Sequence, residues 1–174
     1  MRVREVGRCG MFENFGEFNT FEEINELAEN LFNEGDLESI KTLAKENGIP
    51  ADMAKMYISG DLPCLCDAMT AAVGKLDVEA RELKLKGLMK DWISYIECEC
   101  EESEEVARAV RRKDKCLKKC IAELLKYSFA NQWAVPQGIL KEAGVKASKV
   151  TFGVPGMGKA REIIAGYYGK GGKK

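Results

Sequence analysis

The sequence predicts a mostly α-helical fold: a small multi-helix bundle with a helix-turn-helix-like unit and at most one or two short strands. Apolar residues recur at intervals of three and four along most of the chain, which is typical of the buried face of an amphipathic helix. Capping residues and glycines divide these runs at positions where helices begin and end. A chain of 174 residues with 45% hydrophobic residues is long enough to bury a core.

The first predicted helix follows a segment without helical periodicity. Residues 1–19 contain three glycines and are expected to form a loose amino-terminal arm. Thr20 and Glu23 then have the spacing of a capping box, in which the two side chains satisfy backbone N–H groups of the first turn. Gly35 is expected to end this helix, since glycine readily adopts the left-handed conformation of a C-cap.

The next two helices have the spacing of a helix-turn-helix. Asp36 caps a helix that stops at Gly48, and Pro50 begins another that ends before Gly60. Residues 43–60, "LAKENGIPADMAKMYISG", therefore resemble the motif of phage repressors, whose second helix enters the major groove. Its exposed face would carry Ala51, Asp52 and Lys55. Because none of these is an Arg, Asn or Gln that reads bases, a packing role is favoured, and a DNA-binding regulator stays the alternative.

The remaining elements are also mainly helical. "LPCLCDAMTAAVG" predicts a short buried helix ended by Gly74, and a long helix follows from about Asp77 to Glu102. Ser103 could cap a short helix, and helical spacing returns between Asp114 and Phe129. A further short helix is expected between Pro136 and Gly144, and a last one after Pro155. Residues 170–174, "KGGKK", are expected to be a disordered tail.

The charges are divided along the chain. Residues 1–105 contain 11 Lys and Arg against 24 Asp and Glu, whereas residues 106–174 contain 16 against 4. We therefore distinguish an acidic helical region, 20–105, from a basic helical region, 106–169. Such asymmetry indicates a partner with a strong charge of its own, such as nucleic acid or a nucleic-acid channel. Attraction between the two regions, within one chain or between copies, explains the same split.

Two groups of charged residues are candidate binding sites. The acidic group lies in "ECECEESEE" and consists of Glu97, Glu99, Glu101 and Glu102. The basic group consists of Arg111, Arg112, Lys113, Lys115, Lys118, Lys119 and Lys159. Tyr127, Phe129 and Trp133 follow the basic run, and cations beside exposed aromatic rings suit single-stranded nucleic acid. A solvated helix face, with Phe129 and Trp133 in the core, explains the same residues and is favoured.

Lys159 also belongs to a match with the phosphate-binding P-loop. Gly153, Gly158 and Lys159 have the spacing G-x-x-x-x-G-K, between a strand-like run and a helix-like run. A working motif needs Ser or Thr next, to hold magnesium, and a parallel sheet behind it, but position 160 is Ala. A nucleotide hydrolase is therefore disfavoured. Either the turn's glycines allow tight packing, which is favoured, or its N–H groups and Lys159 hold a phosphate or a carboxylate.

The cysteines and the missing histidine bear on catalysis and metal binding. The chain contains no histidine, which excludes a Cys–His nucleophile pair. An odd number of cysteines, seven, without an export signal predicts reduced thiols packed in helices. Their lack of C-x-x-C spacing predicts no metal or cofactor. No apolar run is long enough for a membrane span and no secretory signal is present, so a cytoplasmic location is expected. No feature of the sequence indicates an enzyme.

Three stretches carry a resemblance to a known family. They are "FNTFEEINELAENLFNEGDLESIKTLAKENGI", "ARAVRRKDKCLKKCIAELLKYSFANQ" and "KVTFGVPGMGKAREIIAGYYGKG". Together they resemble small proteins carried by phages and conjugative elements of gut Firmicutes, and within that group the chain is similar to type II-A anti-CRISPR proteins. The resemblance covers residues 18 to 171. "KCLKKCI" and "AGYY" also resemble the PcfK-like proteins of conjugative plasmids.

The resemblance implies a non-enzymatic inhibitor that binds Cas9 with its guide RNA and stops target DNA from being bound or cut. Cas9 holds its nucleic acids in strongly basic channels. The acidic helices of residues 21–38, or the "ECECEESEE" segment, would compete there with DNA phosphates, while the basic residues would touch DNA or RNA phosphates. A PcfK-like accessory role in DNA transfer and a helix-turn-helix regulator are the alternatives. No catalytic residue follows from the resemblance.

Overall fold

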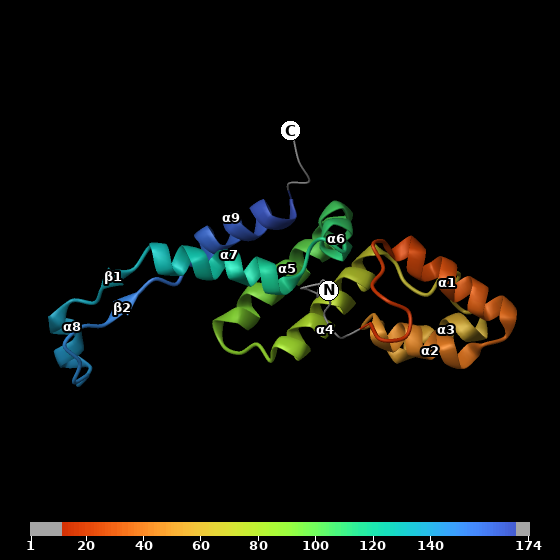
Figure 1. Cartoon of the computed structure of the whole chain (residues 1–174), viewed down its shortest axis with the longest axis horizontal. Coiled ribbons are helices and arrows are strands. Elements are labelled where there is room, and N and C mark those ends of the chain that lie inside the picture. The colour runs from red at the N-terminus through yellow and green to blue at the C-terminus, as the bar shows by residue number, and fades with distance from the viewer. Residues whose placement is uncertain (1–11, 170–174) are drawn as a thin grey trace, which may run out of the picture. The chain divides into compact units, whose positions relative to one another are not determined.

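The computed structural model describes residues 12–169, which are mostly helical (Figure 1). Within them the chain forms nine helices and one two-stranded sheet. The predicted fold class is therefore confirmed. The chain divides into two compact units, Met1–Leu117 and Lys118–Lys174. Most of the predicted arm and the predicted disordered tail lie outside the described residues.

The first unit contains six helices in two packed groups. These helices are α1 (Phe21–Glu34), α2 (Leu37–Glu46), α3 (Ala51–Ser59), α4 (Ala68–Leu83), α5 (Leu88–Glu102) and α6 (Glu104–Arg111). Helix α2 packs against both α1 and α3, while α4, α5 and α6 pack against one another (Figure 1). The core of the first group contains the fully buried Ile24, Ile40 and Leu43. These side chains come from the apolar stripes that the periodicity predicts.

The predicted helix ends are confirmed for α1 to α3. The Thr20 hydroxyl accepts a hydrogen bond from the Glu23 N–H, and the Asp36 carboxylate accepts one from Ser39. Gly35 and Gly60 have left-handed φ angles of 78° and 84°. These contacts join residues three or four positions apart, which is why local sequence predicts them.

The end of the predicted loose arm is packed. Phe15 and Phe18 pack against the α1–α3 core. The Glu17 carboxylate pairs with Lys75 of α4 at 2.9 Å, and the Asn14 N–H donates to the Glu46 carboxylate at 3.1 Å. Residues 12–19 are therefore held by side chains far away in the sequence, which helical periodicity does not detect.

The predicted helix boundaries between residues 62 and 102 are wrong. Gly74 does not end a helix but lies inside α4, and the predicted long helix is interrupted between Leu83 and Leu88. A Cβ at Gly74 would lie 2.3 Å from the Asn47 carbonyl oxygen. Gly74 is thus explained by the close approach of α4 to the turn between α2 and α3. Lys84 ends α4 instead, with a left-handed φ of 51°.

The second unit is built around two helices and a ribbon. Its elements are α7 (Leu117–Ala130), β1 (Trp133–Ala134), α8 (Gln137–Glu142), β2 (Thr151–Phe152) and α9 (Met157–Tyr168). Strands β1 and β2 pair antiparallel, with Trp133 opposite Phe152. Helix α9 lies beside α7, and α8 lies at the far end of the ribbon (Figure 1). Helix α7 begins at Leu117, three residues later than predicted.

The compact units and the charge regions do not coincide. Residues 106–117, the start of the predicted basic region, belong to the first unit because α6 packs against α4 and α5. The second unit is nevertheless strongly basic, with 11 Lys and Arg against 3 Asp and Glu in residues 118–174.

Candidate functional site

The acidic candidate residues form the carboxyl end of α5. Glu97, Glu99, Glu101 and Glu102 occupy its last two turns, and no basic residue lies in the last turn. Glu101 and Glu102 are exposed, while Glu97 and Glu99 are half-buried. A helix carboxyl end carries partial negative charge, so carboxylates there are unfavourable and cations are preferred. With respect to the dipole of α5 these carboxylates are unfavourable, although the amino end of α6, capped by Ser103, begins directly after them.

The carboxylates of this group also repel one another. The pKa of Glu97 is raised, first by partial burial and then by the negative charges of Asp77 and Glu101. Within the described residues, Glu101 and Glu102 form no ion pair that would neutralise them. A cationic partner would relieve this repulsion, which makes the end of α5 suitable for contact with a basic surface.

Helix α1 presents a second acidic surface. Glu22, Glu26 and Glu29 lie on its exposed face, at the i, i+4, i+7 spacing of one helix side. Glu22 pairs with Arg108 of α6 at 2.6 Å, and this pairing contributes to the lowered pKa of Glu22. Glu26 and Glu29 have no ion pair among the described residues.

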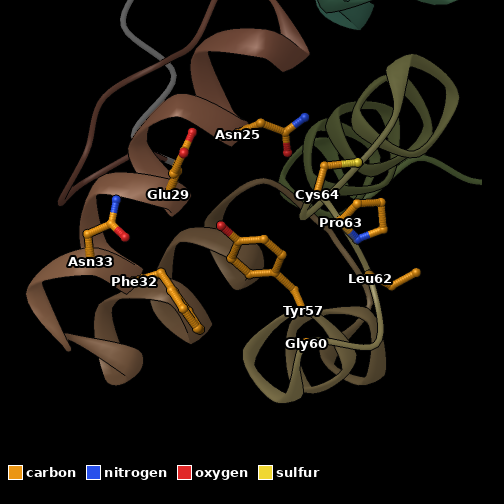
Figure 2. A pocket seen from close by; sticks show the side chains of 9 residues that line it. All are labelled: Asn25, Glu29, Phe32, Asn33, Tyr57, Gly60, Leu62, Pro63 and Cys64. Atoms are coloured by element: carbon orange, nitrogen blue, oxygen red, sulfur yellow. The ribbon is translucent and has the colours of Figure 1, made fainter.

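A small pocket lies next to this face of α1 (Figure 2). Its volume is 370 Å³, and it lies between α1, the Tyr57 ring of α3 and the loop that contains Cys64. The Tyr57 ring packs edge-on against Phe32, with ring centroids 5.9 Å apart. Burial and then the charge of Glu29 raise the pKa of Tyr57. Glu29 is the only charged residue in the described part of the chain that lines the pocket.

Arg111 is not available to a partner, which corrects the prediction for this residue. Its side chain is only 1% exposed and donates a hydrogen bond from Nη2 to the Asn47 carbonyl oxygen Oδ1 at 2.7 Å. Burial lowers the pKa of Arg111. Residues 112–116 lie between α6 and α7, so the cations of the basic group do not share one helix face. Arg112 pairs with Asp114 at 2.9 Å, and Lys115 is half-buried. Lys113, Lys118 and Lys119 are exposed.

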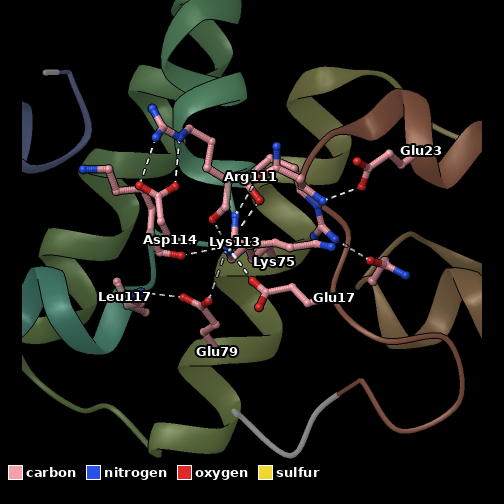
Figure 3. A network of polar contacts seen from close by, with 12 residues as sticks. Glu17, Glu23, Lys75, Glu79, Arg111, Lys113, Asp114 and Leu117 are labelled. Carbon is pink, nitrogen blue, oxygen red and sulfur yellow. Dashed lines mark hydrogen bonds and ion pairs between the residues drawn. The ribbon is translucent and has the colours of Figure 1, made fainter. Parts of the chain in front are cut away.

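Arg111 belongs to a buried polar network that the sequence analysis missed (Figure 3). The Lys75 ammonium donates to the carbonyl oxygens of Arg111, Arg112 and Lys115, at 3.3, 2.7 and 2.8 Å. The Glu79 carboxylate accepts a hydrogen bond from the Leu117 N–H at 2.6 Å, and burial raises the pKa of Glu79. Lys75 thus caps the carboxyl end of α6, and Glu79 holds the N–H of Leu117, the last residue of the first unit.

This network is structural, and one signal in the sequence could have found it. Lys75 and Glu79 are four residues apart in "AAVGKLDVEA", whose other residues are mostly small or apolar. Charged residues in such a setting are buried only when they are paired. Their partners, however, are the Glu17 carboxylate and backbone groups about 40 residues later, which no local pattern identifies.

Of the two P-loop glycines, Gly153 serves packing, whereas a Cβ at Gly158 would meet nothing within 4 Å among residues 12–169. A Cβ at Gly153 would lie 2.1 Å from the Ser128 carbonyl oxygen, so glycine allows the chain after β2 to pass close to α7. Gly156 is the N-cap of α9, and Lys159 in its first turn pairs with Glu162 at 2.7 Å. The sheet beside this turn is two-stranded and antiparallel, whereas the phosphate-binding loop needs a parallel sheet. The geometry therefore agrees with the favoured packing interpretation at Gly153 but not at Gly158.

The helix-turn-helix spacing is confirmed, but its outer face is neutral. Helices α2 and α3 are joined by a tight turn in which Gly48 has a φ of 67°. On α3, Asp52 and Lys55 pair with each other at 2.8 Å, and this ion pair lowers the pKa of Asp52 and raises that of Lys55. No contact of α3 favours base recognition over packing.

Phe129 and Trp133 are exposed, which overturns their favoured assignment to the core, whereas Tyr127 is half-buried. Phe129 is 69% and Trp133 is 53% exposed. An interpretation from periodicity assigns aromatic residues to the core, because it takes for granted that another element packs over them. Beyond Asn131 the chain leaves α7 as a thin ribbon, where such a layer is missing from the described residues.

Other classes of site find little support in residues 12–169. No three Cys, Asp or Glu side chains come together there as a metal-binding group. None of the helices in this range combines the length and apolar content that crossing a bilayer requires. The chain matches no protein-family model, and comparisons with curated proteins and with solved structures give no significant match.

Proposed function

We propose that this chain is a non-enzymatic inhibitor of Cas9, carried by a mobile genetic element and acting in the bacterial cytoplasm. It binds Cas9 that is loaded with guide RNA and keeps target DNA from being bound or cut. The resemblance of three separated stretches to type II-A anti-CRISPR proteins supports the identity of the partner. The main structural support is the unneutralised acidic surface at the carboxyl end of α5.

That surface has the chemistry of a competitor for DNA. Cas9 binds nucleic acid backbones through basic channels with little regard to sequence. Carboxylates held on a rigid helix can occupy such a channel, because they present negative charge without a base sequence to match. Charge complementarity with a cationic channel would speed association and fix the orientation of the complex.

The exposed cations provide a second point of contact. Lys113, Lys118 and Lys119 are accessible and could touch the phosphates of guide RNA or target DNA. Arg111 is excluded from this role by burial, and Arg112 is engaged with Asp114. Fewer cations would thus contact nucleic acid than the basic run in the sequence contains.

A cleavage assay tests the proposal. The protein is titrated into guide-loaded Cas9 with a matching target DNA, and size-exclusion chromatography compares Cas9 with and without guide. We expect dose-dependent loss of cleavage and a complex that elutes as one species with guide-loaded Cas9. Full cleavage at a large molar excess, together with separate elution, would refute the proposal.

A further inference from the structure

The ribbon of the second unit has almost no core of its own. Between Asn131 and Phe152 only Leu140 is buried, and Val135 and Val150 are half-buried. The segment nevertheless has defined structure: the Val135 N–H donates to the Val150 carbonyl oxygen at 2.8 Å. Figure 1 shows it extending from α7 and α9 to α8. A segment that exposes most of its apolar side chains is suited to contact with a partner.

Two aromatic rings form a platform on this ribbon. Trp133 and Phe152 are directly opposite each other in the antiparallel pair, so their side chains lie on one face with Cβ atoms about 5 Å apart. They are 53% and 56% exposed. Neither ring stacks on another ring among the described residues. About half of each side chain is therefore accessible to a ligand.

The charges around the platform are those of a site for a polyanion. Lys141, Lys146 and Lys149 are exposed between β1 and β2, and none has an ion pair within the described part of the chain. Glu142 is the only acidic residue between positions 131 and 158. Lysines without ion-pair partners are available to phosphates, and each phosphate contact releases a counterion.

We propose that the ribbon binds single-stranded nucleic acid, with bases stacked on Trp133 and Phe152 and phosphates held by Lys146 and Lys149. Base stacking on exposed aromatic residues beside cations is the common mode of sequence-tolerant single-strand binding. A duplex would bind less well, since its bases are stacked on each other and present no free face. This property is independent of Cas9 inhibition, because it requires neither Cas9 nor the acidic surface.

Fluorescence anisotropy of the full chain with labelled 20-nucleotide strands tests the proposal. Separate titrations use mixed-sequence DNA, the corresponding RNA and the DNA duplex, at low and at physiological salt. We expect both single strands to bind more tightly than the duplex, with affinity that falls steeply as salt rises. The DNA and RNA titrations show which single strand is preferred.

Matched variants separate stacking from general apolar contact. Trp133→Ala and Phe152→Ala should each weaken binding roughly 5- to 100-fold, as expected for the loss of one stacked base. Ile139→Ala, an equally exposed apolar residue of α8, should leave the affinity unchanged. Trp133→Tyr should restore most of it, because tyrosine keeps an aromatic face. The double variant Lys146→Gln/Lys149→Gln should reduce the slope of log affinity against log salt concentration by about two, one for each lost phosphate contact.

Several outcomes would overturn the proposal. They are equal affinity for duplex and single strand, unchanged binding by the Trp133→Ala/Phe152→Ala double variant, and an equal loss with Ile139→Ala. The last would indicate a protein-binding surface, and light scattering would then show whether a second copy of the chain covers it. Since none of these titrations contains Cas9, their failure leaves the proposed inhibition untouched, and a failed cleavage assay leaves this proposal standing.

Discussion

Gly74 and Gly166 are both glycines inside helices, but only one has a neighbour where a side chain would be. A Cβ at Gly74 would lie 2.3 Å from the Asn47 carbonyl oxygen, whereas nothing lies within 4 Å of the corresponding position at Gly166. Gly74→Ala should therefore destabilise the protein by about 1–3 kcal/mol through overpacking. Gly166→Ala should stabilise it by about 0.5–1 kcal/mol, because alanine is the better helix former.

Thermal and urea unfolding followed by circular dichroism measure both effects. Gly166→Ala is the matched control, since the substitution and the helical setting are the same. A neutral or stabilising Gly74→Ala would contradict the close approach of α4 to the turn between α2 and α3.

The cysteines differ in reactivity because they differ in burial. Burial raises the pKa of Cys66 and of Cys100 to about 12, whereas Cys64 and Cys98 are exposed. Only the thiolate reacts, so iodoacetamide at pH 8 should modify Cys64 and Cys98 much faster than the buried pair. Peptide mass spectrometry measures each site. Equal rates at Cys64 and Cys66 in the folded protein would contradict the burial.

The same two thiols make stability depend on pH. Their pKa is higher in the folded than in the unfolded protein, so the stability they contribute is fully present below about pH 9 and is lost as pH rises towards 12. The free energy of unfolding should therefore fall between pH 8.5 and pH 10.5. In the Cys66→Ala/Cys100→Ala variant this fall should be smaller, as urea unfolding across the pH range would show. An identical slope would contradict the raised pKa values.

At the level of elements, Lys75 joins α4 to the connection between α6 and α7. Its ammonium holds three carbonyl oxygens and pairs with Glu17 at 2.9 Å. Lys75→Met should destabilise the first unit by roughly 3–5 kcal/mol, because it leaves buried acceptors without a donor. Urea unfolding measures this through Trp92 fluorescence in a Trp133→Phe background. The control is Lys90→Met, at an exposed position of α5, which should change stability little.

The acidic end of α5 predicts a gain of stability on charge reversal. Glu101→Lys with Glu102→Lys places cations at a helix carboxyl end, which should raise the free energy of unfolding by about 0.5–1 kcal/mol. The same change at Glu104 and Glu105 is the matched control. Those residues occupy the first turn of α6, where Glu104 pairs with Arg108, so their reversal should destabilise. Opposite signs in thermal unfolding would support the helix-end explanation, and equal signs would refute it.

On the scale of the whole molecule, the exposed carboxylates of α1 and α5 belong to the first unit, and the second unit is basic. If the end of α5 contacts Cas9, Glu101→Lys with Glu102→Lys should abolish inhibition although the protein becomes more stable. Glu26→Lys with Glu29→Lys makes the same charge change on α1 and tests the other acidic surface. Cleavage assays with both variants identify the contact. Full inhibition by both would remove the acidic surface from the proposed mechanism.

The extent to which sequence predicted this protein depends on how far each interaction reaches along the chain. Caps at Thr20 and Asp36 and the left-handed turns at Gly35 and Gly60 were predicted correctly, since their contacts join near neighbours. A helix end at Gly74 was predicted wrongly. Glycine is needed there because the backbone of Asn47, 27 residues away, lies against it. The candidate site follows the same rule. The acidic end of α5 could be predicted from neighbouring residues, but the burial of Arg111 could not, because it depends on distant segments.

By itself, therefore, the sequence determined the helical class, the capped helices of the first group and the separation of charge along the chain. Periodicity, caps and composition are local properties, and the folded chain keeps them. Only the tertiary structure decided that Arg111 is buried, that residues 12–19 are packed, and that Trp133 and Phe152 face outward as a pair. Exposure depends on which distant segments come together, and the packing energy that selects them is spread over the whole core.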